Sequence, residues 1–394
     1  MANIYMMHST TAPLDPRVRE RMLPLLDEDP RKPAGLLSDG RMPARILEES
    51  RGHVAALVGA RPEEIVFTSG GTEACNLALK GIALARIERV SKAGKGGPAA
   101  RILVAGTEHT AVLYPARTLA RLGFEVRELP VDRWGVVALD ALTDMLGASA
   151  CLVSVALATA ETGTLQPVEE IARIVHERGA LLHTDACLAA GSMSVDVKTL
   201  GVDLASLSAH KMAGPRGVGA LYVRDGLRLT PQIEGGVNES GRRGGTEYLA
   251  GIAGFGEAAR LAEAEMSERE PRLAGLGTMM QEAFAGLEGV TLNGHPERRL
   301  RSLVNVSVSG VEGEALLLKL AARGIAASSG SSCFQETGKP SHVLLAMGMD
   351  PELARSSVLF SAGLDTSAEE IRRVVDLFPR TIAALRAIAV RPRP

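Results

Sequence analysis

The sequence predicts an α/β protein of two domains, a large one built on a mostly parallel β-sheet and a smaller one of the α+β class. Short apolar runs alternate with helical stretches between residues 65 and 207, and these runs are apolar almost throughout. Such runs are typical of parallel strands that helices cover on both faces. The pattern changes from about residue 260, and 394 residues are too many for one hydrophobic core. We therefore assign residues 13–259 to the large domain, and residues 1–12 and 260–394 to the small one.

The large domain is expected to follow an irregular lead-in, residues 5–18, whose turn residues are Pro13, Asp15 and Pro16. Strands and helices then alternate, and functional groups should gather where the strands end. The expected strands are 65–67, 102–105, 151–157, 181–183 and 205–207, and the expected helices are 44–58, a stretch up to about residue 90, 111–122 and 168–177.

The second half of the chain begins with a flexible, basic loop over residues 235–245. A long helix over residues 246–267 is expected to leave the large domain. The small domain should then contain strands at 303–308, 325–327 and 358–361, with helices at 314–322 and 367–388. The N-terminal lead-in is expected to pack on this domain.

The composition restricts the class of protein. A formal net charge of −2 provides no bulk field that would attract nucleic acid or an anionic membrane. Cys75, Cys151, Cys187 and Cys333 lack C-x-x-C spacing, so we expect no zinc or other metal site. The N-terminus does not read as a secretion signal, and no apolar run approaches the roughly 18 residues that span a bilayer. We expect a cytoplasmic protein with free thiols.

One lysine lies at the end of a buried strand. The apolar run Leu204–Leu207 leads into Ser208, His210 and Lys211, and a Gly/Pro turn precedes a second apolar run, Ala220–Val223. Desolvation there disfavours the charged form of the amine, which suits a lysine that forms a Schiff base. For a lysine considered by itself, the alternative is a side chain that extends from the strand end into water.

Other polar residues occupy equivalent places. A strand runs into T-S-G-G-T-E-A-C-N, residues 68–76, and then into a helix. A glycine turn at a helix start directs backbone N–H groups at a phosphate, although no G-K-[ST] follows, so this is not a nucleotide P-loop. The candidate functional residues at strand ends are Thr72, His109, Asp185, His210 and Lys211.

These motifs together resemble the cysteine desulfurases of iron–sulfur assembly, pyridoxal 5'-phosphate (PLP) enzymes of the class V aminotransferase family. The resemblance extends from about Tyr5 to about Phe378. It rests on S-T-T-A-P-L-D-P-R-V, E-I-V-F-T-S-G-G-T-E-A-C-N, T-E-H-T-A-V-L, H-T-D-A, S-A-H-K-M-A-G-P-R-G-V-G-A-L-Y-V, R-G-G-T-E, S-S-G-S-S-C and P-S-H-V-L-L-A-M-G. It implies fold type I of the PLP-dependent transferases, with a mostly parallel seven-stranded sheet.

The resemblance also implies a role for individual residues. Lys211 matches the lysine that binds PLP covalently, and Asp185 matches the carboxylate paired with the pyridinium nitrogen, which keeps the ring an electron sink. His109 matches the histidine that stacks on the ring and moves protons. Cys333 matches the loop cysteine that attacks substrate sulfur and carries the persulfide. The matches to phosphate ligands are Gly71 and Thr72 at the glycine turn, Ser208, His210 and, from a partner subunit, Thr246.

The departures from the family pattern lie on the substrate side. Leu359 stands in place of the arginine that pairs with the substrate carboxylate, and leucine cannot replace an arginine fork. Ala160 and Leu188 replace an asparagine and a glutamine that contact the phenolic oxygen of the cofactor, and Lys32 and Leu37 also depart. Lys32, Arg242 and Arg243 are candidates to supply the missing carboxylate contact.

Two functions stay open. The first is a homodimeric PLP-dependent cysteine desulfurase that converts L-cysteine, or a related amino thiol, to alanine and a persulfide on Cys333, and passes the sulfur to an acceptor protein. The second is a PLP-binding homologue that acts on another amine, or a weakly active partner in sulfur transfer. Cys333 favours the first, whereas Leu359, Ala160 and Leu188 favour the second.

Overall fold

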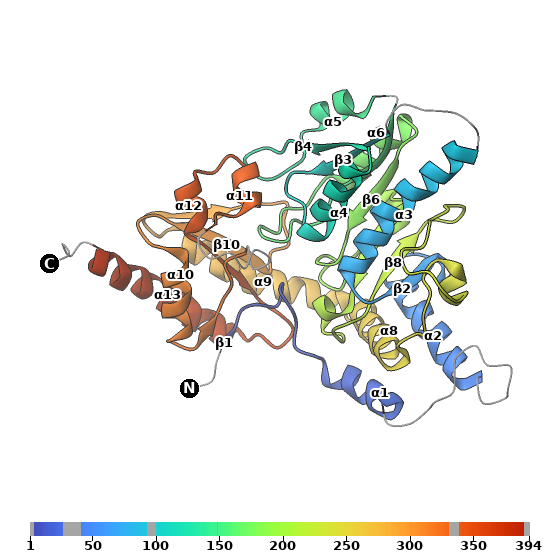
Figure 1. Cartoon of the computed structure of the whole chain (residues 1–394). Coiled ribbons are helices and arrows are strands. Elements are labelled where there is room, and N and C mark those ends of the chain that lie inside the picture. The colour runs from blue at the N-terminus through green and yellow to red at the C-terminus, as the bar shows by residue number, and fades with distance from the viewer. Residues whose placement is uncertain (1–3, 27–40, 93–99, 148, 331–338, 390–394) are drawn as a thin grey trace.

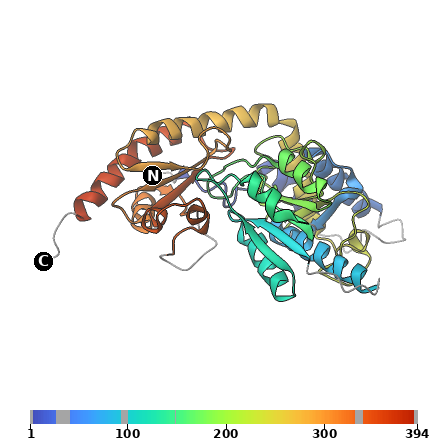
Figure 2. The same cartoon turned by 90° about the horizontal axis from the view of Figure 1, so that it is seen from above.

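The computed structural model describes residues 4–26, 41–92, 100–147, 149–330 and 339–389. Two lobes lie side by side (Figures 1 and 2). Helix α9, Met266–Ala285, runs along one side of the molecule from the large lobe to the small one (Figure 2). The exact division at residues 13–259 stays a prediction.

The large lobe contains a seven-stranded sheet in the order β2-β8-β7-β6-β5-β3-β4. Strand β8 is antiparallel to both of its neighbours, and the other neighbouring pairs are parallel. This confirms the predicted mostly parallel sheet. The strands are β2, Ile65–Thr68; β3, Arg101–Ala105; β4, Glu125–Leu129; β5, Ala150–Ser154; β6, Leu181–Asp185; β7, Leu204–Ser208; and β8, Gly219–Val223.

Apolar side chains from both faces of this sheet are buried. Leu103 and Val153 belong to one hydrophobic cluster, whereas their strand neighbours Ile102 and Leu152 belong to the other. Alternation along a strand places the two sets on opposite faces. The helices of the lobe are α1, Pro16–Leu26; α2, Arg41–Leu57; α3, Gly71–Lys92; α4, Thr110–Arg121; α5, Leu139–Leu146; α6, Val168–Glu177; α7, Val197–Leu200; and α8, Leu249–Ala264.

The small lobe contains an antiparallel sheet in the order β12-β10-β9 and a two-stranded parallel pair, β1 with β11. Phe284, Phe360 and Phe378 form the centre of its core, which also contains Ile4 and Met6 from the N-terminal segment. Besides α9, the elements are β1, Ile4–Tyr5; β9, Val290–Asn293; β10, Leu303–Val308; α10, Gly313–Ala321; β11, Ile325–Ala326; α11, His342–Ala346; α12, Pro351–Arg355; β12, Ser357–Ser361; and α13, Ala368–Ala389.

Two expectations about elements are wrong. The lead-in is not irregular throughout, because α1 starts at Pro16, and proline is favoured in the first helical turn. The single helix expected over 246–267 is instead two helices, α8 and α9, that meet at Glu265. None of the helices in the described part of the chain is long and apolar enough to cross a membrane.

Candidate active site

The residues predicted at strand ends gather at one edge of the large sheet. Gly71 and Thr72 open α3 directly after β2, and His109 is the N-cap of α4 after β3. Asp185 ends β6, and Ser208 ends β7. His210 and Lys211 follow in a short 3-10 helix, Ala209–Met212. The carboxyl ends of parallel strands form the usual ligand edge of such a sheet.

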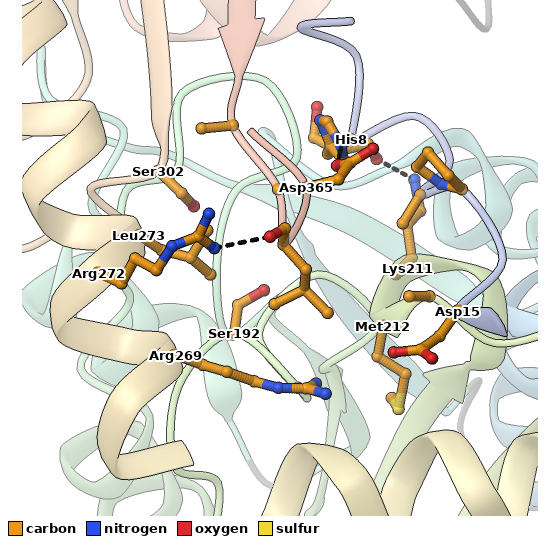
Figure 3. A pocket seen from close by; sticks show the side chains of 18 of the residues that line it. His8, Asp15, Ser192, Lys211, Met212, Arg269, Arg272, Leu273, Ser302 and Asp365 are labelled. Atoms are coloured by element: carbon orange, nitrogen blue, oxygen red, sulfur yellow. Dashed lines mark hydrogen bonds and ion pairs between the residues drawn. The ribbon is translucent and has the colours of Figure 1, made fainter. Parts of the chain in front are cut away.

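Lys211 points toward the N-terminal segment. Its Nζ donates to the backbone carbonyl oxygens of Ser9 and of Thr10, the latter at 2.9 Å. A cavity of about 570 Å³ adjoins it. Arg269 and Arg272 reach into this cavity from α9, and Lys211 stands across from them beside Asp15 and Met212 (Figure 3). The predicted lysine therefore lies at an accessible place between the two lobes.

Arg269 is a residue that the sequence did not single out. Its side chain is 5% exposed, and its Nε and Nη2 donate to Glu265 at 3.0 and 2.8 Å. Among the described residues its Nη1 has no acceptor. An arginine in a helix of ordinary composition carries no local signal, and only the packing of α9 against the lead-in brings it to this cavity.

Asp185 is held by two neighbours. Its Oδ1 accepts the backbone N–H of Cys187 at 2.9 Å, and its Oδ2 lies 3.7 Å from Cys75 Sγ. Burial, reinforced by the charge of Asp185, raises the pKa of the Cys75 thiol and that of the Cys187 thiol well above the usual value for cysteine. Both cysteines are therefore neutral S–H groups beside the carboxylate.

The glycine turn and β7 meet closely. A Cβ placed on Gly71 would lie 2.6 Å from Cys187 Sγ and 3.5 Å from the Cβ of Ser208, so only glycine fits there. The Ser208 hydroxyl is buried and has no partner among the described residues. An orphaned hydroxyl beside the amino end of a 22-residue helix fits a phosphate group. His210 shares a hydrogen bond with Thr11, and burial lowers its pKa to about 4, helped by the charges of Lys211 and Arg216.

His109 caps its helix through a ring nitrogen. Its Nδ1 accepts the backbone N–H of Ala111 at 3.1 Å. In the neutral ring, this bond assigns the proton to Nε2. The capping bond also limits rotation of the ring, so a fixed imidazole stands beside the strand ends.

Not every predicted residue is brought to this edge. Thr246 is exposed in the segment before α8. Arg243 Nε donates to Glu73 at 3.0 Å, and Arg242 Nη1 donates to the carbonyl oxygen of Glu63 at 3.2 Å. Cys333, Lys32 and Leu37 lie outside the described residues.

Leu359 and Leu188, two of the departures from the family pattern, lie in different surroundings. Leu359 is buried in β12, between Val358 and Phe360, which both face the core of the small lobe. Its side chain therefore faces the other way, on the side of its strand partner Asn305, whose Nδ2 donates to the backbone of Glu161 at 3.0 Å. Leu188 lines the cavity that adjoins Lys211.

Two buried carboxyl groups near the strand ends were missed from the sequence. Burial raises the pKa of Glu161 to about 7, and its Oε2 accepts the Ser341 hydroxyl at 2.5 Å. Burial and the charge of Asp185 raise the pKa of Glu108 to about 8, and Glu108 is fully buried. Glu108 is therefore largely protonated at neutral pH, whereas Glu161 is about half protonated there. Each adjoins a motif residue, but a lone glutamate in a motif shows nothing of its burial.

Replacing Glu108 with glutamine is expected to stabilise the protein at alkaline pH. The folded-state pKa of about 8 lies above the ordinary value of 4.5, so the stability contributed by the protonated form is complete below about pH 4.5 and is lost as the pH rises to about 8. Each pKa unit corresponds to about 1.4 kcal/mol. We expect Glu108→Gln to gain on the order of 5 kcal/mol at pH 8.5 and at most about 1 kcal/mol at pH 5, measured by denaturant unfolding.

The matched control for this measurement is Glu128→Gln, which changes an exposed carboxylate on β4. It should leave the free energy of unfolding unchanged at both pH values. An equal stabilisation by Glu108→Gln at pH 5 and pH 8.5 would mean that the buried carboxyl is not the group whose ionisation matters.

The comparisons agree with this geometry. Residues 4–374 match the family described as aminotransferase class-V. The chain belongs to that family. It is 41% identical over 387 residues to "Cysteine desulfurase IscS" of Dictyoglomus turgidum, covering 98% of this chain and 96% of that protein. It is 40% identical over 385 residues to "Cysteine desulfurase IscS 1" of Archaeoglobus fulgidus, covering 98% of each.

A solved structure named "NIFS-LIKE PROTEIN" has the same architecture, with a TM-score of 0.88, 32% identity, and coverage of 97% of this chain and 100% of that one. The predicted fold class and the resemblance to cysteine desulfurases are therefore confirmed. Membership of the class-V family implies dependence on PLP. The orphaned Ser208 hydroxyl, the glycine turn, Asp185 and Lys211 are the groups that fit it. Within the described residues, no group of three or more histidine, cysteine, aspartate or glutamate side chains could hold a metal ion.

Proposed function

We propose that the protein is a PLP-dependent cysteine desulfurase, which converts L-cysteine and a protein thiol to alanine and a protein persulfide. The bond between Cβ and sulfur of cysteine breaks, a sulfur–sulfur bond to Cys333 forms, and a proton is added at Cβ. Sulfur is oxidised and carbon is reduced, so the reaction balances without another redox agent. When bound, PLP supplies the electron sink for this chemistry.

Each strand-end residue has a role in this proposal. The amine of Lys211 would bind PLP covalently. Asp185 would pair with the ring nitrogen, and His109, whose Nδ1 accepts the Ala111 N–H at 3.1 Å, would stack on the ring and present Nε2 for proton transfer. Gly71, Thr72, Ser208 and His210 would hold the phosphate, with Thr246 added from a partner subunit.

The observation that best supports the proposal is that Lys211, Asp185 and the glycine turn occupy one sheet edge in a chain about 40% identical to named cysteine desulfurases. The test is to mix the purified protein with L-cysteine and a thiol reductant, and to measure alanine and sulfide together. Equal amounts of both products support the proposal. Bound PLP without either product would refute it and leave the alternative, a homologue that acts on another amine.

The alternative, a homologue that acts on another amine, is favoured by the apolar residues Leu359, Ala160 and Leu188. The substitution Leu359→Arg tests it. An arginine there would restore a charged contact with a carboxylate, worth roughly 1.5–3 kcal/mol. We expect KM for L-cysteine to fall by about tenfold to a hundredfold, measured from the rate of alanine release. Leu359→Met, which keeps the volume without the charge, separates this effect from a change in packing. Equal KM values for Leu359→Arg and the original protein would mean that another residue binds the carboxylate.

We further propose a homodimer with shared active sites. Thr246 lies in a segment where Val237 and Tyr248 are also exposed, 89% and 49% respectively, and a partner subunit would cover these side chains. Light scattering should give the mass of two chains, and Thr246→Ala should release PLP faster than the original protein. A monomer that retains its full content of PLP would contradict this prediction. A cytoplasmic location and a sulfur-acceptor protein belong to the same proposal.

A further inference from the structure

A line of buried polar side chains crosses the large sheet beneath the strand ends. Ser154, His183 and Ser206 lie on the neighbouring strands β5, β6 and β7, and each is 0% exposed. The two ring nitrogens of His183 share hydrogen bonds with Ser154 Oγ at 2.8 Å and Ser206 Oγ at 2.9 Å. Polar groups in a sheet core are costly unless they are paired, and these three satisfy one another.

The line continues to Glu108. The Ser154 hydroxyl donates to Oε1 of Glu108, the residue that precedes His109, at 3.3 Å. At the other end of the line, Ser206 is the register partner of Asp185 on β6, and the Sγ of Cys75, on α3, lies 3.7 Å from Asp185 Oδ2. These buried groups therefore surround the strand end that carries Asp185.

The donor in the bond between Ser154 and Glu108 sets the direction of the others. Burial lowers the pKa of His183 to about 4, so its ring is neutral, with one donor and one acceptor nitrogen. Because the Ser154 hydroxyl donates to Glu108, its oxygen accepts the Nδ1 proton of His183, and Nε2 then accepts the Ser206 hydroxyl. The Ser206 hydroxyl is thereby engaged, and the Cys75 thiol is the side-chain donor to Asp185 Oδ2.

We propose that Cys75 is a positioning residue for Asp185. Its thiol holds Asp185 Oδ2 in place while the backbone N–H of Cys187 holds Oδ1. The consequence for the cofactor, a carboxylate of fixed orientation under the ring nitrogen, rests on the proposed function. The hydrogen bond between Cys75 and Asp185 does not.

The first measurement therefore needs no cofactor. The S–H stretching band in the infrared spectrum of the PLP-free protein reports the bond directly, and the Cys75 component is the part lost in Cys75→Ala. We expect Asp185→Asn to shift this component toward the position of a weakly bonded thiol. A component that does not move on this substitution overturns the proposal, whether or not the protein binds PLP.

The second measurement uses the PLP-loaded protein. Cys75→Ala should release PLP about threefold to tenfold faster and alter the visible absorption of the bound cofactor, because a thiol is a weak donor but a fixed one. Cys75→Ser, which keeps an O–H donor, should restore both properties. Cys151→Ala is the matched control, since Cys151 is also a buried thiol, on β5, and its pKa is raised by burial without Asp185.

Release and absorption unchanged in Cys75→Ala, with an unchanged unfolding midpoint, would overturn the positioning role.

Discussion

Lys211→Ala is expected to abolish alanine release from L-cysteine, lowering kcat by at least about a thousandfold. The substitution removes both the amine that bonds to PLP and a base within reach of the substrate, and proton transfer by one positioned group contributes about 10²–10⁴-fold. Reduction with borohydride should fix PLP to the original protein at Lys211 and should fix none to the variant. Mass spectrometry of the digested protein identifies the labelled peptide.

The matched control is Lys198→Ala, since Lys198 is an exposed lysine on the short helix α7 of the same lobe. It should retain activity and the borohydride label. Label that remains after Lys211→Ala, at any other lysine, would show that the cofactor is bound elsewhere. The Nζ of Lys211 donates hydrogen bonds to the backbone carbonyl oxygens of Ser9 and Thr10. Among the hydrogen bonds of the described residues, no other lysine donates to these two oxygens.

The sheet could be predicted because its central strands are mostly apolar, as in β5 and β7, in which every residue is buried. Strand β4 was missed for the opposite reason. It lies at the edge of the sheet and reads E-V-R-E-L, with Arg127 and Glu128 exposed, so its composition is that of a loop. The break between α8 and α9 was missed because the chain around Glu265 contains no glycine or proline, and only tertiary packing changes its direction.

The candidate site was predictable to the extent that its residues belong to contiguous motifs. Lys211, Asp185 and His109 follow strands that periodicity already identified. The groups behind them were not predictable, because Cys75, His183 and Glu108 come from three separate segments that meet only when β3, β6 and α3 pack together. Leu188 was identified as a departure from the family pattern, but its place in the wall of a cavity follows from the packing of the two lobes.

Asp185→Asn is expected to lower kcat for alanine release by about a hundredfold or more. Asparagine keeps the shape of the side chain and can still accept the Cys187 N–H, which the carboxylate accepts at 2.9 Å. In the proposed function, it lacks the charge that would keep the ring nitrogen of PLP protonated, so the ring would withdraw electrons less effectively. Asp196→Asn, which changes the carboxylate that caps α7, should leave kcat unaltered. A near-normal kcat in Asp185→Asn would show that the Asp185 carboxylate does not contribute to the reaction.

The same variant separates the charge of Asp185 from its orientation. If Cys75 acts only by holding the carboxylate, then Cys75→Ala should change kcat severalfold in the original protein and hardly at all in an Asp185→Asn background, where the charged acceptor is gone. An undiminished effect of Cys75→Ala in Asp185→Asn would mean that the thiol influences the cofactor by another route, such as packing against α3.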